Sequence, residues 1–259
     1  MKIEEIRDIV RVVRSNEFMT DPPLDFRSLL LHKSKMGEFY KILLEPSMIR
    51  DEDVLSRLYQ DGDPENKYKS LKSYFLSRAL NNITFFELSR TGKSDFVKAI
   101  FKSYKYLFVV RVLLALGSRS GAIKLAKQTL KLAERYELHS VCLDLLGELM
   151  TDSLQLGKER DFMRYMKMAT IHKGLLGNES TIVALQQQIR ILFAKSLFIS
   201  EVHRSEIRTA LGEAKRILKH GDTYLGRISF YRLLYVCHQV EGLPLKSAAS
   251  CDEAITYML

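Results

Sequence analysis

Histidine, cysteine and serine are the residues whose spacing most often reveals an active site or a metal site, and this chain shows no such pattern. The histidines include no His-x-x-x-His or His-Glu-x-x-His pair that would bind a metal. They are His32, His139, His172, His203, His220 and His238. There is also no Gly-x-Ser-x-Gly turn and no glycine-rich phosphate loop. We therefore predict a protein that is not an enzyme and holds no metal or cofactor, with histidines capping helix ends.

Cys142, Cys237 and Cys251 are widely scattered and include no Cys-x-x-Cys pair. An odd, scattered set favours reduced thiols that fill small sites in a core. The amino terminus carries acids within its first eight residues, unlike a secretory signal. The longest apolar run, residues 106–117, is shorter than the roughly 20 residues that span a bilayer. These features predict a soluble, cytoplasmic protein that does not enter a membrane.

Positive charge is concentrated in one short part of the chain. The whole sequence has a net charge of +9, and residues 91–136 contain ten Lys or Arg against two acids, Asp95 and Glu134. Helical spacing puts seven of the basic side chains along two helix faces, and we call them the basic ridge. They are Lys98, Lys102, Lys105, Lys124, Lys127, Lys131 and Arg135. A localised basic surface suits an acidic protein or a nucleic acid.

Two other interpretations of the basic ridge remain open. The ridge lysines could be solvated, or acids on the next helix could pair with them. The acids that could do so are Glu137, Asp144, Glu148 and Asp152. Conversely, Tyr104 and Tyr106 interleave with the lysines as a stacking surface for single-stranded nucleic acid requires.

The elements that position these residues are amphipathic helices. From residue 94 onward, apolar residues recur at helical spacing between short breaks, which predicts an all-α fold. Breaks near residues 117, 157, 202 and 242 give a period of about 40 residues, which is typical of a helix-pair solenoid. A further break is expected at Gly174 to Gly177. The expected helices cover 94–117, 121–137, 139–157, 158–177, 178–200, 203–221, 222–242 and 247–259.

One stretch carries a family resemblance. Ala126, Leu130 and Ala133, followed by Leu146-Gly147 and Met150, resemble the small-large-small and Leu-Gly-x-x-aromatic signatures of tetratricopeptide repeats. Met150 stands in place of the aromatic residue, and the period exceeds 34 residues. The resemblance covers about residues 94–259 and implies a right-handed α-solenoid that binds proteins or peptides on its concave face. Tyr104, Glu148, Gln187 and Arg190 are expected on that face.

The first 90 residues lack this period and are expected to form an irregular helical domain, 1–90, ahead of the tetratricopeptide-like repeats, 91–259. Pro22 and Pro23 break the chain. Residues 34–82 resemble a helix-turn-helix in which Lys67, Lys69, Lys72, Asn81 and Asn82 could reach phosphates or base edges. Surrounding acids favour instead a helical cap that buries Leu71, Phe75, Leu76 and Leu80 against the first repeat.

Together these patterns favour a non-enzymatic scaffold or adaptor that binds a protein or peptide. An acidic partner would suit its basic ridge. The alternative is a nucleic-acid-binding or transcription-regulatory protein that uses 34–82 and 98–135. Met163, Met166 and Met168 are expected to pack as core between repeats, or else to line an adaptable peptide groove. The final helix has no polar capping face, so a homodimer through the C-terminal helices is one expectation.

Overall fold

The computed structural model describes residues 2–14, 34–45, 50–59, 64–83, 93–195 and 200–258. Throughout these residues the regular elements are helices and none is a strand, so the all-α prediction is confirmed. The chain forms two compact units, Met1–Lys98 and Ala99–Leu259, called unit 1 and unit 2. The predicted break at Pro22 and Pro23 lies outside the described residues.

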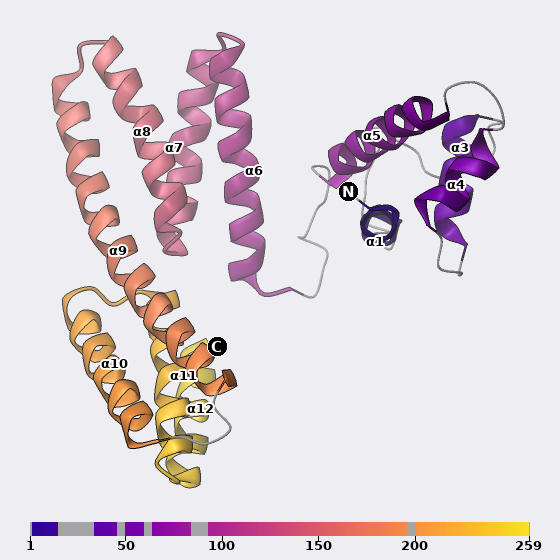
Figure 1. The fold of residues 1–259 in the computed structure, drawn as a ribbon. Coiled ribbons are helices and arrows are strands. Elements are labelled where there is room, and N and C mark those ends of the chain that lie inside the picture. The colour runs from indigo at the N-terminus through magenta and orange to yellow at the C-terminus, as the bar shows by residue number, and fades with distance from the viewer. Residues whose placement is uncertain are drawn as a thin grey trace. The chain divides into compact units, whose positions relative to one another are not determined.

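Unit 1 contains four described helices (Figure 1). They are α1 (Ile3–Arg14), α3 (Lys35–Leu44), α4 (Asp51–Leu58) and α5 (Pro64–Ile83). Phe75 of α5 is fully buried and packs edge-on against Phe39, with ring centroids 5.1 Å apart. The prediction that α5 also buries Leu80 is wrong, because Leu80 lies about 140° around the helix from Phe75 and is exposed. Phe75 packs within the core of unit 1, so the prediction that this helix buries it against the first repeat is also wrong. The core of unit 1 lies along one side of α5.

Unit 2 is built from antiparallel helices joined mostly by short turns (Figure 1). The helices are α6 (Asp95–Ala115), α7 (Arg119–Arg135), α8 (His139–Gln155), α9 (Glu159–Lys195), α10 (Glu201–His220), α11 (Tyr224–Val240) and α12 (Pro244–Met258). The boundary between the two units falls in the first turn of α6.

Four of these helices end in the same turn. Gly117, Glu137, Gly157 and Gly242 all have a positive φ, and the next residue donates its N–H to a carbonyl five residues earlier at 2.8–2.9 Å. This is the Schellman arrangement that closes helix C-termini. The predicted turns at Gly117, Gly157 and Gly242 are thus confirmed. The turn at Glu137 ends α7 at Arg135, two residues earlier than predicted, with a residue other than glycine in the left-handed region.

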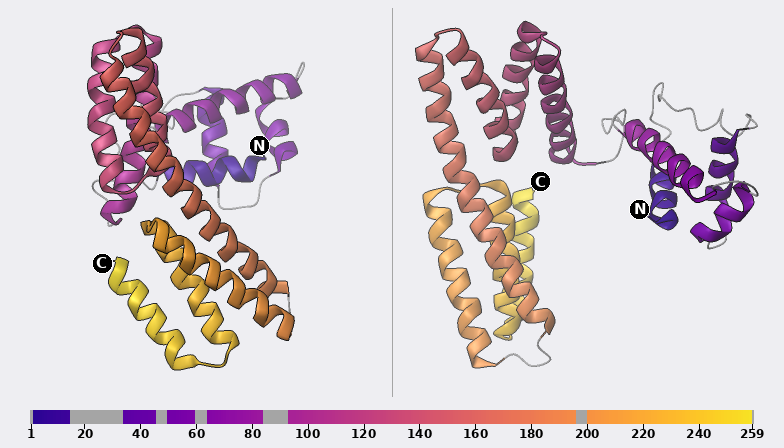
Figure 2. Two further views of the ribbon diagram at one scale, coloured as in Figure 1. Left: turned by 90° about the vertical axis from the view of Figure 1, so that its left-hand side faces the viewer. Right: turned by 45° about the horizontal axis from the view of Figure 1, so that its top comes forward.

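The predicted break at Gly174 to Gly177 is wrong. Helix α9 runs without interruption through both glycines, for 37 residues in all. Its N-terminal half packs on α8, and its C-terminal half packs on α10 and α11, as both views in Figure 2 show. Ile182 and Ile189 of α9 join a core with Ile207 of α10 and Leu233 of α11. Helix α9 therefore belongs to both halves of unit 2, the half that contains α8 and the half that contains α10 and α11.

The two glycines inside α9 carry a prediction about stability. Both are exposed, and a Cβ added at either position would meet no atom within 4 Å. Glycine in a helix interior costs about 0.5–1 kcal/mol relative to alanine. We expect Gly174→Ala and Gly177→Ala each to stabilise unit 2 by about that amount, measured by urea denaturation.

A matched control comes from a glycine that does sit in a turn. Gly157 has a φ of +62°, so Gly157→Ala should destabilise unit 2. A loss of stability in Gly174→Ala and Gly177→Ala as well would contradict the continuous helix.

Candidate partner-binding surface

The basic ridge is divided between two neighbouring helices. Its first three residues lie on α6 and its other four on α7, as the helical spacing predicted. Lys98 forms an ion pair with Asp95, with Nζ and Oδ1 3.3 Å apart. Lys102 lies 5.6 Å from the ring centroid of Tyr106, and Arg135 has the same kind of cation–π contact with the ring of Tyr136. These three cations are therefore partly engaged within the chain.

The remaining lysines of the ridge are uncompensated. They are Lys105, Lys124, Lys127 and Lys131, which are all exposed. Across the part of the chain that the structure describes, they form no ion pair with an acid. The ridge therefore presents net positive charge to solvent along α7.

The acids that could have paired with the ridge lysines contact other groups instead. Asp144 and Glu148 of α8 both accept from Arg111 of α6, at 2.9 and 3.3 Å. Asp152 pairs with Arg119 at 2.5 Å. Glu137 accepts a hydrogen bond from the backbone N–H of Tyr224 at 2.6 Å. Arginine competes better for these carboxylates because its guanidinium offers several donors in a fixed plane.

The hydrogen bonds of Arg111 lie on a surface to which both α6 and α8 contribute. The hydroxyl of Tyr104 on α6 lies 3.1 Å from that of Ser140 on α8. Tyr104 is exposed, while Tyr106 is partly covered, so only one of the two expected stacking residues has an open face. Tyr104 and Glu148 therefore lie on one surface, whereas Gln187 and Arg190 are exposed on the C-terminal half of α9.

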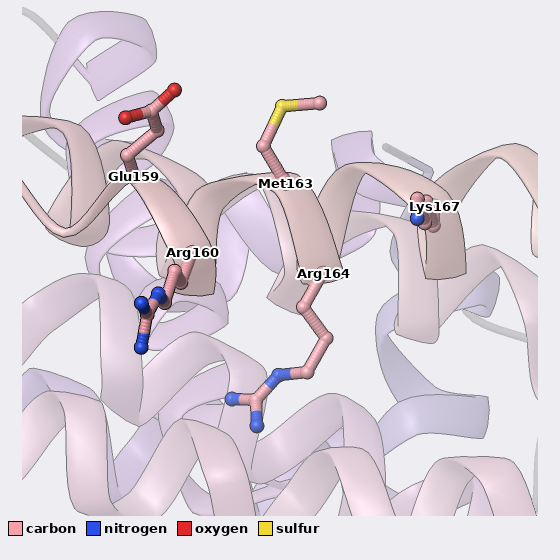
Figure 3. A pocket seen from close by; sticks show the side chains of 5 residues that line it. All are labelled: Glu159, Arg160, Met163, Arg164 and Lys167. Atoms are coloured by element: carbon pink, nitrogen blue, oxygen red, sulfur yellow. The ribbon is translucent and has the colours of Figure 1, made fainter.

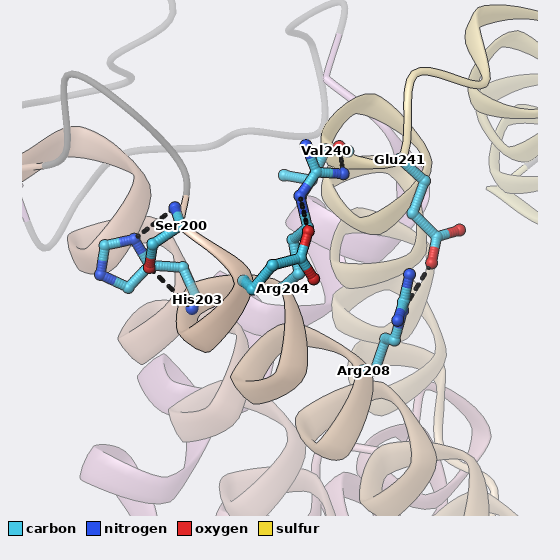
Figure 4. Close-up of polar contacts among 7 residues, drawn as sticks. Ser200, His203, Arg204, Arg208, Val240 and Glu241 are labelled. Carbon is cyan, nitrogen blue, oxygen red and sulfur yellow. Dashed lines mark hydrogen bonds and ion pairs between the residues drawn. The ribbon is translucent and has the colours of Figure 1, made fainter.

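A second set of polar contacts joins α10 to the end of α11 (Figure 4). Arg204 donates to the carbonyl of Val240 at 2.7 Å, and Arg208 donates to Glu241 at 2.8 Å. Ser200 caps α10 by accepting from the N–H of His203. Both links join consecutive antiparallel helices, with partners 33 to 36 residues apart in the sequence, whereas Arg111 links the alternate helices α6 and α8.

Two of the lysines that a helix-turn-helix would use are engaged within unit 1. Lys72 donates to Asp51 at 2.7 Å, and Lys69 pairs with Glu65. Burial opposes ionisation of Asp51, but the hydrogen bonds from Lys72 and Tyr68 lower its pKa. Phosphate contacts from Lys72 would have to displace a bound carboxylate. Lys67 is exposed, and the nucleic-acid role of residues 34–82 stays a prediction.

Two histidines that are far apart in sequence meet inside unit 2. The Nδ1 atoms of His139 on α8 and His172 on α9 lie 3.0 Å apart, and Nε2 of His172 is 3.8 Å from Glu134. His139 is 4% exposed, and its Nε2 has no hydrogen-bond partner among the residues that the structure describes. Among the described residues no three His, Cys, Asp or Glu are arranged to hold a metal ion. This pair could not be predicted from the sequence, because the two histidines are 33 residues apart.

The buried histidine predicts a pH dependence. Burial lowers the pKa of His139, and the neighbouring His172 lowers it further. The unfolded chain therefore takes up this proton more readily than the folded chain does once the pH falls below about 6.5. We expect the free energy of unfolding of unit 2 to decrease from pH 7 toward pH 5, measured by urea denaturation at each pH.

The matched variant for this prediction is His139→Leu, which removes the proton-binding group from a buried site. Burial raises the pKa of the Glu179 carboxyl, so protonation of Glu179 favours the folded state as the pH falls, opposite to His139. The informative quantity is therefore the difference in free energy of unfolding between the wild type and His139→Leu at each pH. Identical pH profiles for the wild type and His139→Leu would contradict the assignment.

Cys142 and Cys237 are buried, and His220 lies at a helix end. All three cysteines are free, and burial raises the pKa of the Cys142 thiol to about 12, which makes it unreactive. His220 contacts the carbonyl of Arg216 at 2.9 Å at the end of α10, as capping predicted. The predicted core role of the methionines is wrong for Met163 and Met166, which are exposed.

Met163 belongs to a shallow surface hollow (Figure 3). All five of its lining residues come from one helix, α9: Glu159, Arg160, Met163, Arg164 and Lys167. Because a single helix cannot enclose a substrate, we assign no catalysis to it. A second hollow lies between α9 and α10, and its lining residues include Leu185 and Ile189 of α9 and Glu206 and Glu213 of α10.

No protein-family model, curated protein or solved structure matches the chain. None of the described helices is long and apolar enough to cross a membrane.

Proposed function

We propose that unit 2 is a right-handed tetratricopeptide-like solenoid and that the protein is a non-enzymatic scaffold for a protein or peptide. Regular helix packing supports this proposal. Arg111–Asp144 joins the alternate helices α6 and α8, whereas Arg119–Asp152, His139–His172 and Arg208–Glu241 join consecutive antiparallel helices. The turns at Gly117, Glu137 and Gly157 also follow one another at intervals of 20 residues. Such regularity is typical of stacked helix pairs.

The observation that carries the proposed binding role is the uncompensated charge on α7. Lys124, Lys127 and Lys131 are exposed along one helix face, while the α8 acids Asp144 and Asp152 are already held by arginines. An acidic protein surface would gain electrostatic attraction there without displacing an existing ion pair. The partner that best fits this ridge is therefore an acidic protein or peptide.

The test is a pull-down from native lysate with the tagged full-length chain, before and after nuclease treatment. We expect a discrete protein that survives nuclease and is lost when Lys124, Lys127 and Lys131 are all changed to Glu. A matched control changes three exposed lysines elsewhere in unit 2, Lys215, Lys219 and Lys246, to Glu. The control should retain the protein, because it alters net charge equally but leaves α7 intact.

Two results would overturn the proposal. Loss of the protein in both triple variants would show that only net charge matters. Nucleic acid that elutes with the chain, dissociates steeply with salt and carries the proteins away on digestion would establish the nucleic-acid alternative instead.

A further inference from the structure

Helix α6 has apolar residues on two opposite sides. One side is buried in unit 2 and contains Ala99, Ser103, Leu107 and Val110. The other side contains Phe101, Phe108 and Val112, and Leu116 follows directly after the last residue of the helix; their intervals of seven, four and four residues put them on one face. We call these four residues, with Lys102 and Lys105 beside them, the α6 face.

The α6 face is well exposed to solvent. Phe101 is 59% exposed, Phe108 62% and Leu116 77%. Soluble proteins expose single apolar side chains often, but contiguous apolar patches usually mark a surface that another molecule covers. A surface helix normally has one apolar stripe, and a helix that is apolar on both sides is normally covered on both. The packing of unit 2 therefore does not explain why α6 has a second apolar stripe.

Charge indicates what kind of molecule covers this face. Within α6 the single acid is Asp95, and it is already paired with Lys98. Lys102 and Lys105 lie beside the apolar stripe, and neither forms an ion pair with any residue in the described ranges. A second copy of the same face would bring these lysines against each other. A covering segment with acidic residues beside an apolar stripe would instead pair with them.

We propose that the α6 face is a docking site for an acidic amphipathic helix of a partner protein. The apolar stripe of that helix packs on Phe101 and Phe108, and its flanking Asp or Glu residues pair with Lys102 and Lys105. This mode of recognition lays an apolar helix face against a complementary one. The inference rests on the proposed scaffold function and names a partner chemistry for a surface distinct from the α7 lysines.

The experiment measures fluorescence anisotropy of labelled helical peptides with the full-length chain. The probe is a 21-residue peptide with a leucine stripe at helical spacing and glutamates on both flanks. A second peptide has the same stripe with lysines in place of the glutamates. We expect the acidic peptide to bind at least about tenfold more tightly than the basic one, because each pair of like charges is unfavourable.

Variants of the chain locate the site. Phe101→Ser combined with Phe108→Ser should weaken binding of the acidic peptide by at least about tenfold. The matched control combines Ile171→Ser with Ile191→Ser, since Ile171 is 62% exposed on α9 and Ile191 is exposed too. That control should bind like the wild type, and circular dichroism should show equal helix content in all three proteins.

Several outcomes would overturn this inference. They are equal binding of both peptides, no binding of the acidic peptide, and no effect of the phenylalanine changes. Self-association in sedimentation that Phe101→Ser with Phe108→Ser removes would assign the face to a second copy. If the partner from the lysate needs the α7 lysines but not the two phenylalanines, the scaffold function stands and the α6 proposal fails. If it needs the phenylalanines alone, the α6 proposal stands and the α7 lysines are not the binding site.

Discussion

Replacing Phe75 by alanine is expected to lower the free energy of unfolding of unit 1 by about 3–5 kcal/mol, the usual cost of emptying a buried aromatic site. Phe75 is fully buried, its ring lies 5.1 Å from Phe39, and it stacks on Tyr40 at 6.2 Å. Alanine would leave a cavity that α3 and α5 cannot close without repacking. Because Phe75 packs in the core of unit 1, we expect the stability of unit 2 to stay unchanged.

Hydrogen exchange with mass spectrometry measures this effect segment by segment. Peptides from residues 64–83 should lose protection in Phe75→Ala, while peptides from 139–195 should keep it. Tyr74→Ala, on the same helix but at an exposed position, is the matched control and should change protection little. Equal loss of protection in both units would show that the units unfold together, against the prediction of two domains.

Replacing Ala126 by leucine is expected to destabilise unit 2 by about 2–3 kcal/mol, because overpacking a close helix contact forces side chains and backbone apart. Ala122, Ala126 and Ala133 are fully buried along one side of α7. Urea denaturation of the variant and the wild type measures the difference.

The informative comparison is Gly147→Ala on α8, the other small residue of the tetratricopeptide-like signature. A Cβ at Gly147 would meet no atom within 4 Å, so this change should stabilise the helix slightly. A tolerated leucine at Ala126 would contradict the close contact on α7. A destabilising alanine at Gly147 would show that α8 lies closer to its neighbours than the structure has it.

The helices themselves could be predicted from the sequence because buried residues recur at helical spacing. Turns were predictable where the chain needs a left-handed residue and uses glycine, as at Gly117 and Gly157. The same rule failed twice. At Gly174 and Gly177 glycine occupies an exposed helix position, and at Glu137 the left-handed position holds a residue whose side chain accepts from Tyr224. Sequence alone does not separate a glycine that a turn requires from one that a helix tolerates.

The candidate site could be predicted only in part. The basic ridge was visible because its lysines share helix faces within single segments. The absence of acids that neutralise these lysines could not be predicted. Whether Asp144 pairs with Arg111 or with a lysine depends on how α6 and α8 pack. The exposed stripe with Phe108 was also hidden, since periodicity shows that α6 is apolar but not which of its sides is covered.

The continuity of α9 has a practical consequence for dividing the chain. At 1.5 Å per residue its 37 residues extend for about 55 Å, and neither half of unit 2 is complete without its share of that length. A fragment that ends at Gly174 or begins at Gly177 would leave part of a core without its covering helix. Truncated versions intended for crystallisation or for separate expression should therefore keep α9 whole.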